Sequence, residues 1–180
     1  MKKIATLFFF VFIFNVADAQ MDVGYNTTDI GAEFQWYGNG EFIGLHAAVN
    51  AKLHHSFHAE VGYYIAGDPT AAFYANENNG GLGLGLGYRY YTMLRPHAFF
   101  IGVKANLFTN KVKLQDTQDP EWRTSKIFIP AFETGYMILV NDLFFITPTL
   151  AIGYKTNLEF KSIDEQKAVG LFGISLGAKF

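Results

Sequence analysis

The densest run of chemically capable side chains is His54-His55-Ser56-Phe57-His58-Ala59-Glu60. On a strand, Ser56, His58 and Glu60 would project from one face, in the order of nucleophile, base and orienting acid of a hydrolase. Residues two apart on a strand lie about 6 to 7 Å apart at their backbones, however, which is long for a direct relay. The three histidines also resemble metal ligands, but the first two fall in a turn and no carboxylate follows at a defined spacing. We therefore assign no catalytic and no metal-binding residue.

Four glycines alternate with leucine in the segment Gly81-Leu-Gly-Leu-Gly-Leu-Gly87. Phosphate-binding loops also contain closely spaced glycines, but a helix must follow directly. The strict period of two is typical of a strand instead, in which glycines leave room for large neighbours such as Arg89 or Tyr91. The segment gives no reason to expect a cofactor.

The elements that would position these residues are strands, because apolar and polar residues alternate along most of the chain. The chain is 17% aromatic and contains 18 glycines, which favours strands over helices. We predict eight strands, at about residues 29–38, 41–53, 56–66, 81–92, 97–114, 125–140, 143–160 and 169–180. Short connections alternate with longer polar ones, so the predicted fold is all-β: an eight-stranded antiparallel up-and-down transmembrane β-barrel.

The second and third strands offer a prediction of register. If Leu53 and Phe57 face each other across a three-residue turn, Lys52 lies opposite His58 and Asn50 lies opposite Glu60. All the polar residues of this hairpin then share one face.

The amino terminus has the three parts of a secretory signal peptide. Two lysines precede an apolar run, and Ala17-Asp18-Ala19 follows as a cleavage site. We expect residues 1–19 to be cleaved and residues 20–180 to form one barrel domain. The chain has no cysteine, and its formal charge of -2 without a basic run gives no reason to expect nucleic acid as a partner.

The polar face of the strands is rich in glycine and holds few, nearly balanced charges. A small and nearly balanced number of charges is typical of an enclosed interior, where each charge needs a partner. We predict a structural polar network in the lumen, formed by Glu33, Lys52, His58, Glu60, Arg89, Lys104, Glu133 and Lys155. In this hypothesis, Glu60 and Glu133 pair with bases such as Arg89 and Lys104 and close the lumen.

The apolar face carries aromatic residues near the strand ends, as expected of two girdles at the borders of a membrane. One girdle would contain Phe57, Tyr90, Phe99, Phe144 and Phe180, and the other Trp36, Phe42, Phe128 and Phe160. The longer connections add Phe73, Tyr74, Asp116, Asp119, Trp122 and Glu165, which could contact a partner.

The last strand, from Val169 to Phe180, alternates apolar residues and ends on an aromatic residue. It resembles the terminal signal that outer-membrane barrels present to the barrel assembly machinery. Together with the signal peptide and the eight strands, the chain resembles small outer-membrane barrels of the OmpA transmembrane domain or OmpX type. The resemblance implies a monomeric, non-enzymatic protein of a Gram-negative outer membrane, in contact with lipid and lipopolysaccharide, with a structural or surface-interaction role.

Three alternatives remain open at this point. The first is an outer-membrane enzyme that modifies lipid A acyl chains with Ser56, His58 and Glu60. The second is a narrow channel for small solutes, although an eight-stranded barrel is just wide enough for its own side chains. The third is a soluble periplasmic carrier similar to lipocalins, whose apolar face would line a cavity.

Overall fold

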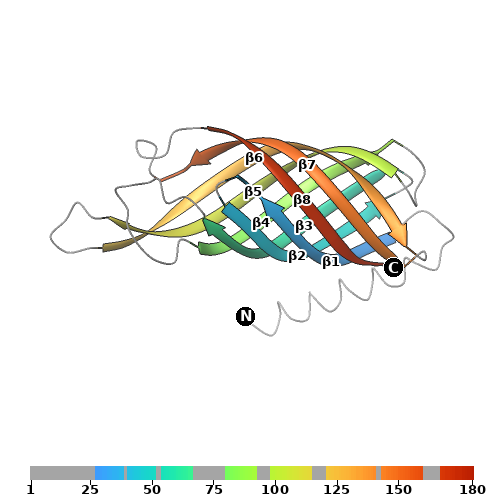
Figure 1. The fold of residues 1–180 in the computed structure, drawn as a ribbon, viewed down its shortest axis with the longest axis horizontal. Helices are drawn as coiled ribbons and strands as arrows, with labels where there is room; N and C mark the ends of the chain where they lie inside the picture. The colour runs from blue at the N-terminus through green and yellow to red at the C-terminus, as the bar shows by residue number, and fades with distance from the viewer. Residues whose placement is uncertain are drawn as a thin grey trace.

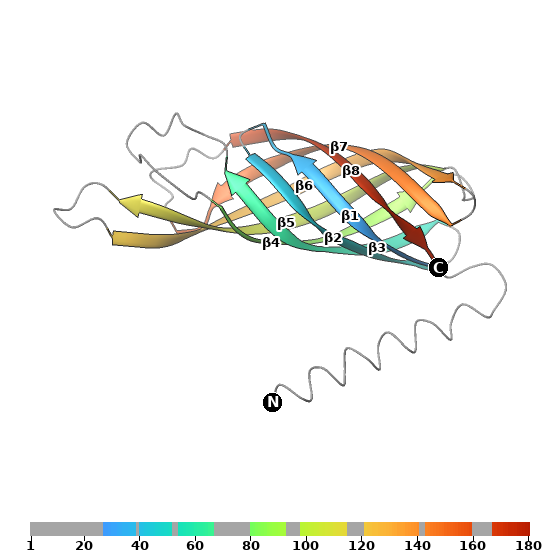
Figure 2. The same ribbon diagram turned by 60° about the horizontal axis from the view of Figure 1, so that its bottom comes forward.

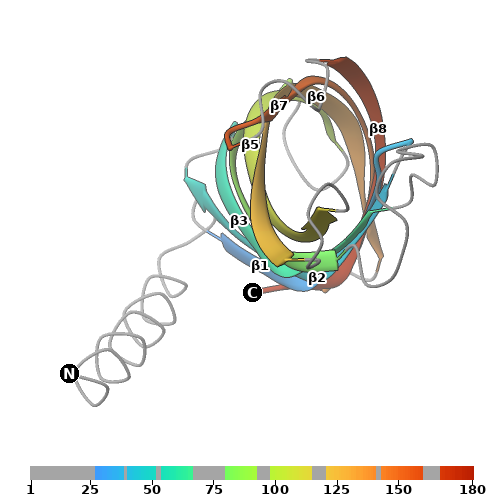
Figure 3. The same cartoon turned by 90° about the vertical axis from the view of Figure 1, so that its left-hand side faces the viewer.

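The described part of the chain forms a closed antiparallel barrel in which each strand pairs with its neighbours in sequence (Figures 1 and 3). The structure, a computed structural model, describes residues 27–38, 40–51, 54–66, 80–92, 98–114, 121–140, 143–159 and 167–180. Within these ranges there is no helix long and apolar enough to cross a membrane. The strands are β1 (Thr27–Trp36), β2 (Gly40–Ala51), β3 (His55–Ala66), β4 (Gly80–Tyr91), β5 (Ala98–Leu114), β6 (Glu121–Val140), β7 (Phe144–Asn157) and β8 (Lys167–Lys179). The predicted fold class and its eight strands are confirmed.

The barrel closes where the first strand pairs with the last. The β1–β8 ladder runs from the Asp29–Lys179 pair to the Trp36–Phe172 pair. Beyond it, the Thr28 amide donates to the Phe180 carbonyl at 2.9 Å, and the Phe180 amide donates to the Thr28 carbonyl at 2.8 Å. The carboxy-terminal residue is therefore part of the closure.

The predicted strand limits are wrong mainly in β6, which begins at Glu121 rather than at residue 125. Its ladder with β5 continues as far as the Leu114–Glu121 pair, through a polar stretch where no apolar alternation marks a strand. Figure 2 shows the ends of β5 and β6 reaching beyond the other strands. The predicted signal peptide and most of the residues predicted to line the longer connections lie outside the described residues.

The register predicted for β2 and β3 is also wrong, although the predicted faces are right. Phe57 lies opposite Val49 rather than Leu53, and Glu60 lies opposite His46 rather than Asn50. A shift by an even number of residues keeps every side chain on its face. The shift changes which residues of β2 and β3 lie opposite each other, and it brings His46 beside Glu60.

The outward face of the barrel is apolar. Leu86 and Phe132 are 68% and 72% exposed, and isoleucine, leucine, valine and aromatic side chains cover the rest of the described strands in the same way. Inward positions hold most of the buried charged and amide side chains. The two faces are therefore the reverse of those of a soluble lipocalin.

Outward aromatic residues mark the end of the barrel where the carboxy terminus and the short connections lie. Phe57, Tyr90, Phe99, Phe144 and Phe180 are all exposed there, as predicted for the first girdle. In the second girdle, Trp36 is exposed, but Phe42 points inward and is buried. Phe42 occupies an inward position of β2 and packs against Phe108 inside the barrel. Phe160 lies outside the described residues.

Two apolar clusters lie inside the barrel. Toward the longer connections, the first contains Tyr37, Phe42, Tyr64, Phe108, Ile127, Ile129, Ala131 and Leu171. Toward the short connections, the second contains Tyr91, Ala98, Phe100, Met137 and Phe145. Along the inward positions of β6, Glu133 lies between residues of the first cluster and residues of the second. Along those of β5, Lys104 and Asn106 lie between the two clusters. Polar side chains thus lie between two apolar layers.

The alternating glycines of β4 make room for large side chains of the interior. A Cβ atom on Gly87 would lie 2.4 Å from the His58 ring, and one on Gly83 would lie 2.7 Å from the Phe42 ring. The residues that fill the space are thus on other strands, with His58 on β3 and Phe42 on β2, and are not Arg89 or Tyr91 of β4 itself. Gly173 of β8 is also buried, but a Cβ there would meet only ordinary contacts, the nearest at 3.5 Å.

We expect Gly87→Ala to lower the free energy of unfolding by about 1 to 3 kcal/mol, because the buried His58 ring must move to accept the methyl group. The measurement is urea unfolding in detergent micelles. Gly173→Ala is the matched control, expected to be neutral or to stabilise by about 0.4 to 1 kcal/mol, because alanine restricts the unfolded chain. Equal effects of the two substitutions would contradict this account of the glycines.

Candidate functional site

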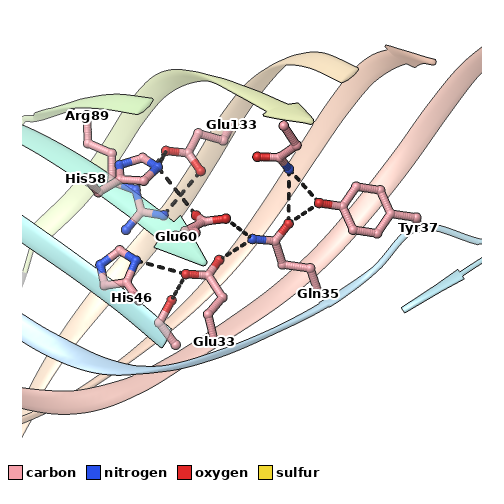
Figure 4. Close-up of polar contacts among 10 residues, drawn as sticks. Glu33, Gln35, Tyr37, His46, His58, Glu60, Arg89 and Glu133 are labelled. Carbon is pink, nitrogen blue, oxygen red and sulfur yellow. Dashed lines mark hydrogen bonds and ion pairs between the residues drawn. The ribbon is translucent and has the colours of Figure 1, made fainter. Parts of the chain in front are cut away.

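Ten buried side chains meet in the middle of the barrel interior (Figure 4). This set, the central polar cluster, consists of Glu33, Gln35, Tyr37, His46, His58, Glu60, Arg89, Asn106, Glu133 and Ser175. Nine of the residues belong to β1 to β6 and β8, and Tyr37 directly follows β1. They meet because inward positions of these strands lie at the same level of the barrel. A closed barrel is the element that brings them together.

The strongest ion pair of the cluster joins Arg89 of β4 to Glu133 of β6. Arg89 Nε donates to Glu133 Oε1 at 2.7 Å, and Nη2 donates to Oε2 at 3.2 Å, so the contact is a fork. The pair spans β5 at Gly102, where a Cβ would come within 3.1 Å of Glu133 Oε1. The guanidinium also lies 4.6 Å from the ring centre of Phe100, a cation–π contact. Arg89 thereby connects the polar cluster to the apolar layer below it.

A glutamine holds the two other glutamates of the cluster. Gln35 Nε2 donates to Glu33 Oε1 at 2.7 Å and to Glu60 Oε2 at 2.6 Å. The Tyr37 hydroxyl donates to Gln35 Oε1, which fixes the orientation of the amide. Ser175 of β8 donates to Glu33 Oε2 at 3.0 Å, across the seam that closes the barrel.

Two histidines lie beside these carboxylates. His46 Nδ1 is 3.0 Å from Glu33 Oε2. His58 Nε2 is 3.6 Å from Glu60 Oε1 and 3.8 Å from Glu133 Oε1. The centres of the two imidazole rings are 5.5 Å apart. Three carboxylates, one arginine and two imidazoles therefore share a small volume from which water is largely excluded.

The structure brings together most of the residues of the predicted lumen network. Glu33, His58, Glu60, Arg89, Lys104 and Glu133 are buried at inward positions. Lys155 is half-buried, and its backbone pairs with that of Lys167 near the longer connections. Lys52 lies outside the described residues. Of the pairings in the hypothesis, Arg89 contacts Glu133, whereas Glu60 accepts its hydrogen bond from Gln35.

The residues considered for a hydrolase do not form a relay. Ser56, His58 and Glu60 are all buried within the barrel, away from the apolar outer face. Ser56 Oγ and both ring nitrogens of His58 lack a hydrogen-bond partner, so no bond joins the serine to the histidine. An acyl chain on the outside of the barrel would not reach these groups.

The histidines at the β2–β3 turn have structural contacts. His54 Nδ1 is 2.6 Å from the Tyr91 carbonyl oxygen, and its ring stacks on Tyr90. His55 Nδ1 is 2.7 Å from the Tyr88 hydroxyl. These two histidines hold the turn against β4 and stand apart from the central polar cluster.

Reasoning from the sequence missed His46, Gln35 and Asn106 as members of the site. The signal was present, because all three occupy inward positions of strands with clear alternation. The predicted register of β2 and β3 placed Asn50 opposite Glu60, whereas His46 lies there in the structure, so the contact of His46 with Glu60 was not predicted.

Comparison of the sequence with protein families and with curated proteins finds no match. Among solved structures, the N-terminal β-barrel domain of Pseudomonas aeruginosa OprF is similar, with a TM-score of 0.57 and 15% identity over 87% of this chain and 99% of that domain. Neisserial surface protein A has a TM-score of 0.46 and 14% identity, over 86% of this chain and 94% of its own. Ail, the attachment invasion locus protein of Yersinia pestis, has a TM-score of 0.43 and 11% identity, over 87% and 97%. The predicted resemblance to small outer-membrane barrels is confirmed at the level of the fold.

We expect Arg89→Ala to destabilise the barrel by about 3 to 5 kcal/mol, because it leaves the buried Glu133 carboxylate without its partner. Urea unfolding in detergent measures this loss, and planar-bilayer recordings measure any rise in conductance. Adding Glu133→Gln should recover part of the stability, because the second change removes the unpaired charge.

Lys126→Ala is the matched control for this pair. Lys126 Nζ lies 2.9 Å from Glu159 Oε1, but both side chains are solvent-accessible, at 50% and 34% exposure. An exposed ion pair contributes about 0 to 1 kcal/mol, so this variant should unfold almost as the parent does. If Arg89→Ala changed neither stability nor conductance, the ion pair would not be what closes the lumen.

Proposed function

We propose that the protein is a non-enzymatic, integral outer-membrane β-barrel with a closed, side-chain-filled lumen and a structural or surface-interaction role. The observation that carries the proposal is the arrangement of the two faces, apolar outside and polar inside. In water, this arrangement would expose a broad apolar belt and bury charges, both of which are unfavourable. In a bilayer, the belt meets the acyl chains, and a closed ladder satisfies the backbone.

The interior supports a closed barrel rather than a channel. The central polar cluster lies between the two apolar clusters, and within it the Arg89–Glu133 fork joins β4 to β6 over Gly102 of β5. Eight-stranded barrels have an interior that side chains can fill. A role at the membrane surface or in the envelope structure fits such a filled barrel better than transport does.

The ends of the barrel suggest where other molecules would contact it. The aromatic residues around the short connections, such as Phe57 and Phe144, suit the border between acyl chains and headgroups. We propose that lipid and lipopolysaccharide surround the belt. The strand that ends at Phe180 is the segment that the barrel assembly machinery would recognise. The extended β5–β6 hairpin is the element best placed for a surface contact of a monomeric barrel.

The first test is gel mobility of the outer-membrane fraction, with and without boiling. A closed barrel often resists detergent until it is heated, because its backbone hydrogen bonds are internal. We expect the band to shift on heating. Recovery as a soluble periplasmic protein without a shift would contradict the proposal and favour a carrier of apolar ligands.

The second test places a charge on the belt. Leu86 is 68% exposed in the middle of β4, and in a bilayer we expect Leu86→Lys to cost about 2 to 4 kcal/mol of unfolding free energy. In a soluble barrel, the same surface substitution would change stability by about 0.5 kcal/mol or less. Urea unfolding in lipid vesicles measures the difference. Leu158→Lys, beyond the end of β7 and beside Glu159, is the control and should be tolerated.

A further inference from the structure

The central polar cluster contains a set of ligands for a metal ion. One ligand atom from each of Glu33, His46 and Glu60 can be chosen so that all three lie within 4.8 Å of one another, and all three side chains are buried. Two carboxylates and an imidazole are the donors that Zn²⁺ and neighbouring divalent transition metals accept. Tetrahedral zinc with bonds of about 2.0 to 2.1 Å needs its ligand atoms roughly 3.3 Å apart, and His46 Nδ1 and Glu33 Oε2 are already 3.0 Å apart.

Unpartnered polar atoms point into the same place, which is a separate observation. Glu60 Oε1 and His58 Nε2 are buried and make no hydrogen bond. His58 Nε2 faces Glu60 Oε1 at 3.6 Å, as the close-up shows (Figure 4). Buried polar atoms are nearly always paired, so these two facing atoms indicate a missing partner that can bind both nitrogen and oxygen. A cation is such a partner.

The charges of the cluster also favour a cation. Arg89 is engaged by Glu133 through two hydrogen bonds. Glu33 and Glu60 then have Lys104 as the buried base that remains in this part of the described interior. Two carboxylates against this one base leave one negative charge in excess, and an uncompensated charge is unfavourable in a desolvated interior.

We propose that the barrel interior binds one divalent transition-metal ion through Glu33, His46 and Glu60, with His58 as the adjacent fourth ligand. Gln35 would act from the outer shell, because its amide holds one oxygen of each glutamate and leaves Glu33 Oε2 and Glu60 Oε1 toward the histidines. Ser175 adds a second hydrogen bond to Glu33. Because apolar clusters lie on both sides, the ion would enter as the barrel folds.

The test is refolding of the full chain from urea into detergent in the presence of Zn²⁺, followed by gel filtration and metal analysis. We expect about one zinc ion per folded chain, retained after chelator treatment. Refolding with Co²⁺ gives a second readout, because visible absorption reports the ligand geometry of bound cobalt. Both measurements need only the parent protein, so they do not depend on whether a variant folds.

Glu60→Gln and His46→Gln should each lower the retained zinc at least about tenfold, because each removes a ligand. His54→Gln and His55→Gln are matched controls that keep the cluster intact, and they should retain the parent amount. A parent barrel that folds, as judged by its mobility shift, but retains no zinc would overturn the proposal. Equal loss in the control variants would assign the metal to the turn instead.

Discussion

The structure depends on one constraint, which is that the ladder of backbone hydrogen bonds must close on itself. An open sheet of this composition would leave two unpaired edges beside an apolar surface, and in hydrocarbon such edges have no partner. Closure through the β1–β8 pairing removes both edges. It also fixes the width of the interior, so that every inward side chain must fit a volume set by eight strands.

The polar interior follows from this limit on space. Glycines lie where large side chains of other strands pass over the inner wall, as Gly102 does beneath the Arg89–Glu133 pair. Charges that enter such a volume must meet partners there, and the amide of Gln35 connects two carboxylates that would otherwise repel each other. The lumen thus combines packing, as in an apolar core, with the specific geometry of hydrogen bonds.

The faces of the strands could be predicted from the sequence, but the neighbours across them could not. Alternation with a period of two assigns Glu33, Glu60, Arg89 and Glu133 to one face whatever the register is. The contact of His46 with Glu60 depends on which residues form the β2–β3 turn, and a two-residue displacement at each strand leaves the alternation unchanged. Contacts between strands that do not pair with each other, such as that of Arg89 on β4 with Glu133 on β6, depend on strand tilt as well, which no local pattern records. The first residues of β6, from Glu121, were missed because this polar part of its ladder carries no apolar alternation.

The position of the seam has a consequence for how the barrel forms. Each strand from β2 to β7 can pair with the strand before it in the sequence, through contacts that are local in sequence. The β1–β8 pairing instead joins Thr28 to Phe180, the two ends of the described chain, and carries the Ser175–Glu33 hydrogen bond with it. Among the strand pairings, this one closes the longest loop and so has the largest entropic cost of closure. We therefore expect Glu33 to gain its hydrogen bond from Ser175 only at the final step of assembly, so that the interior is completed when the wall is closed.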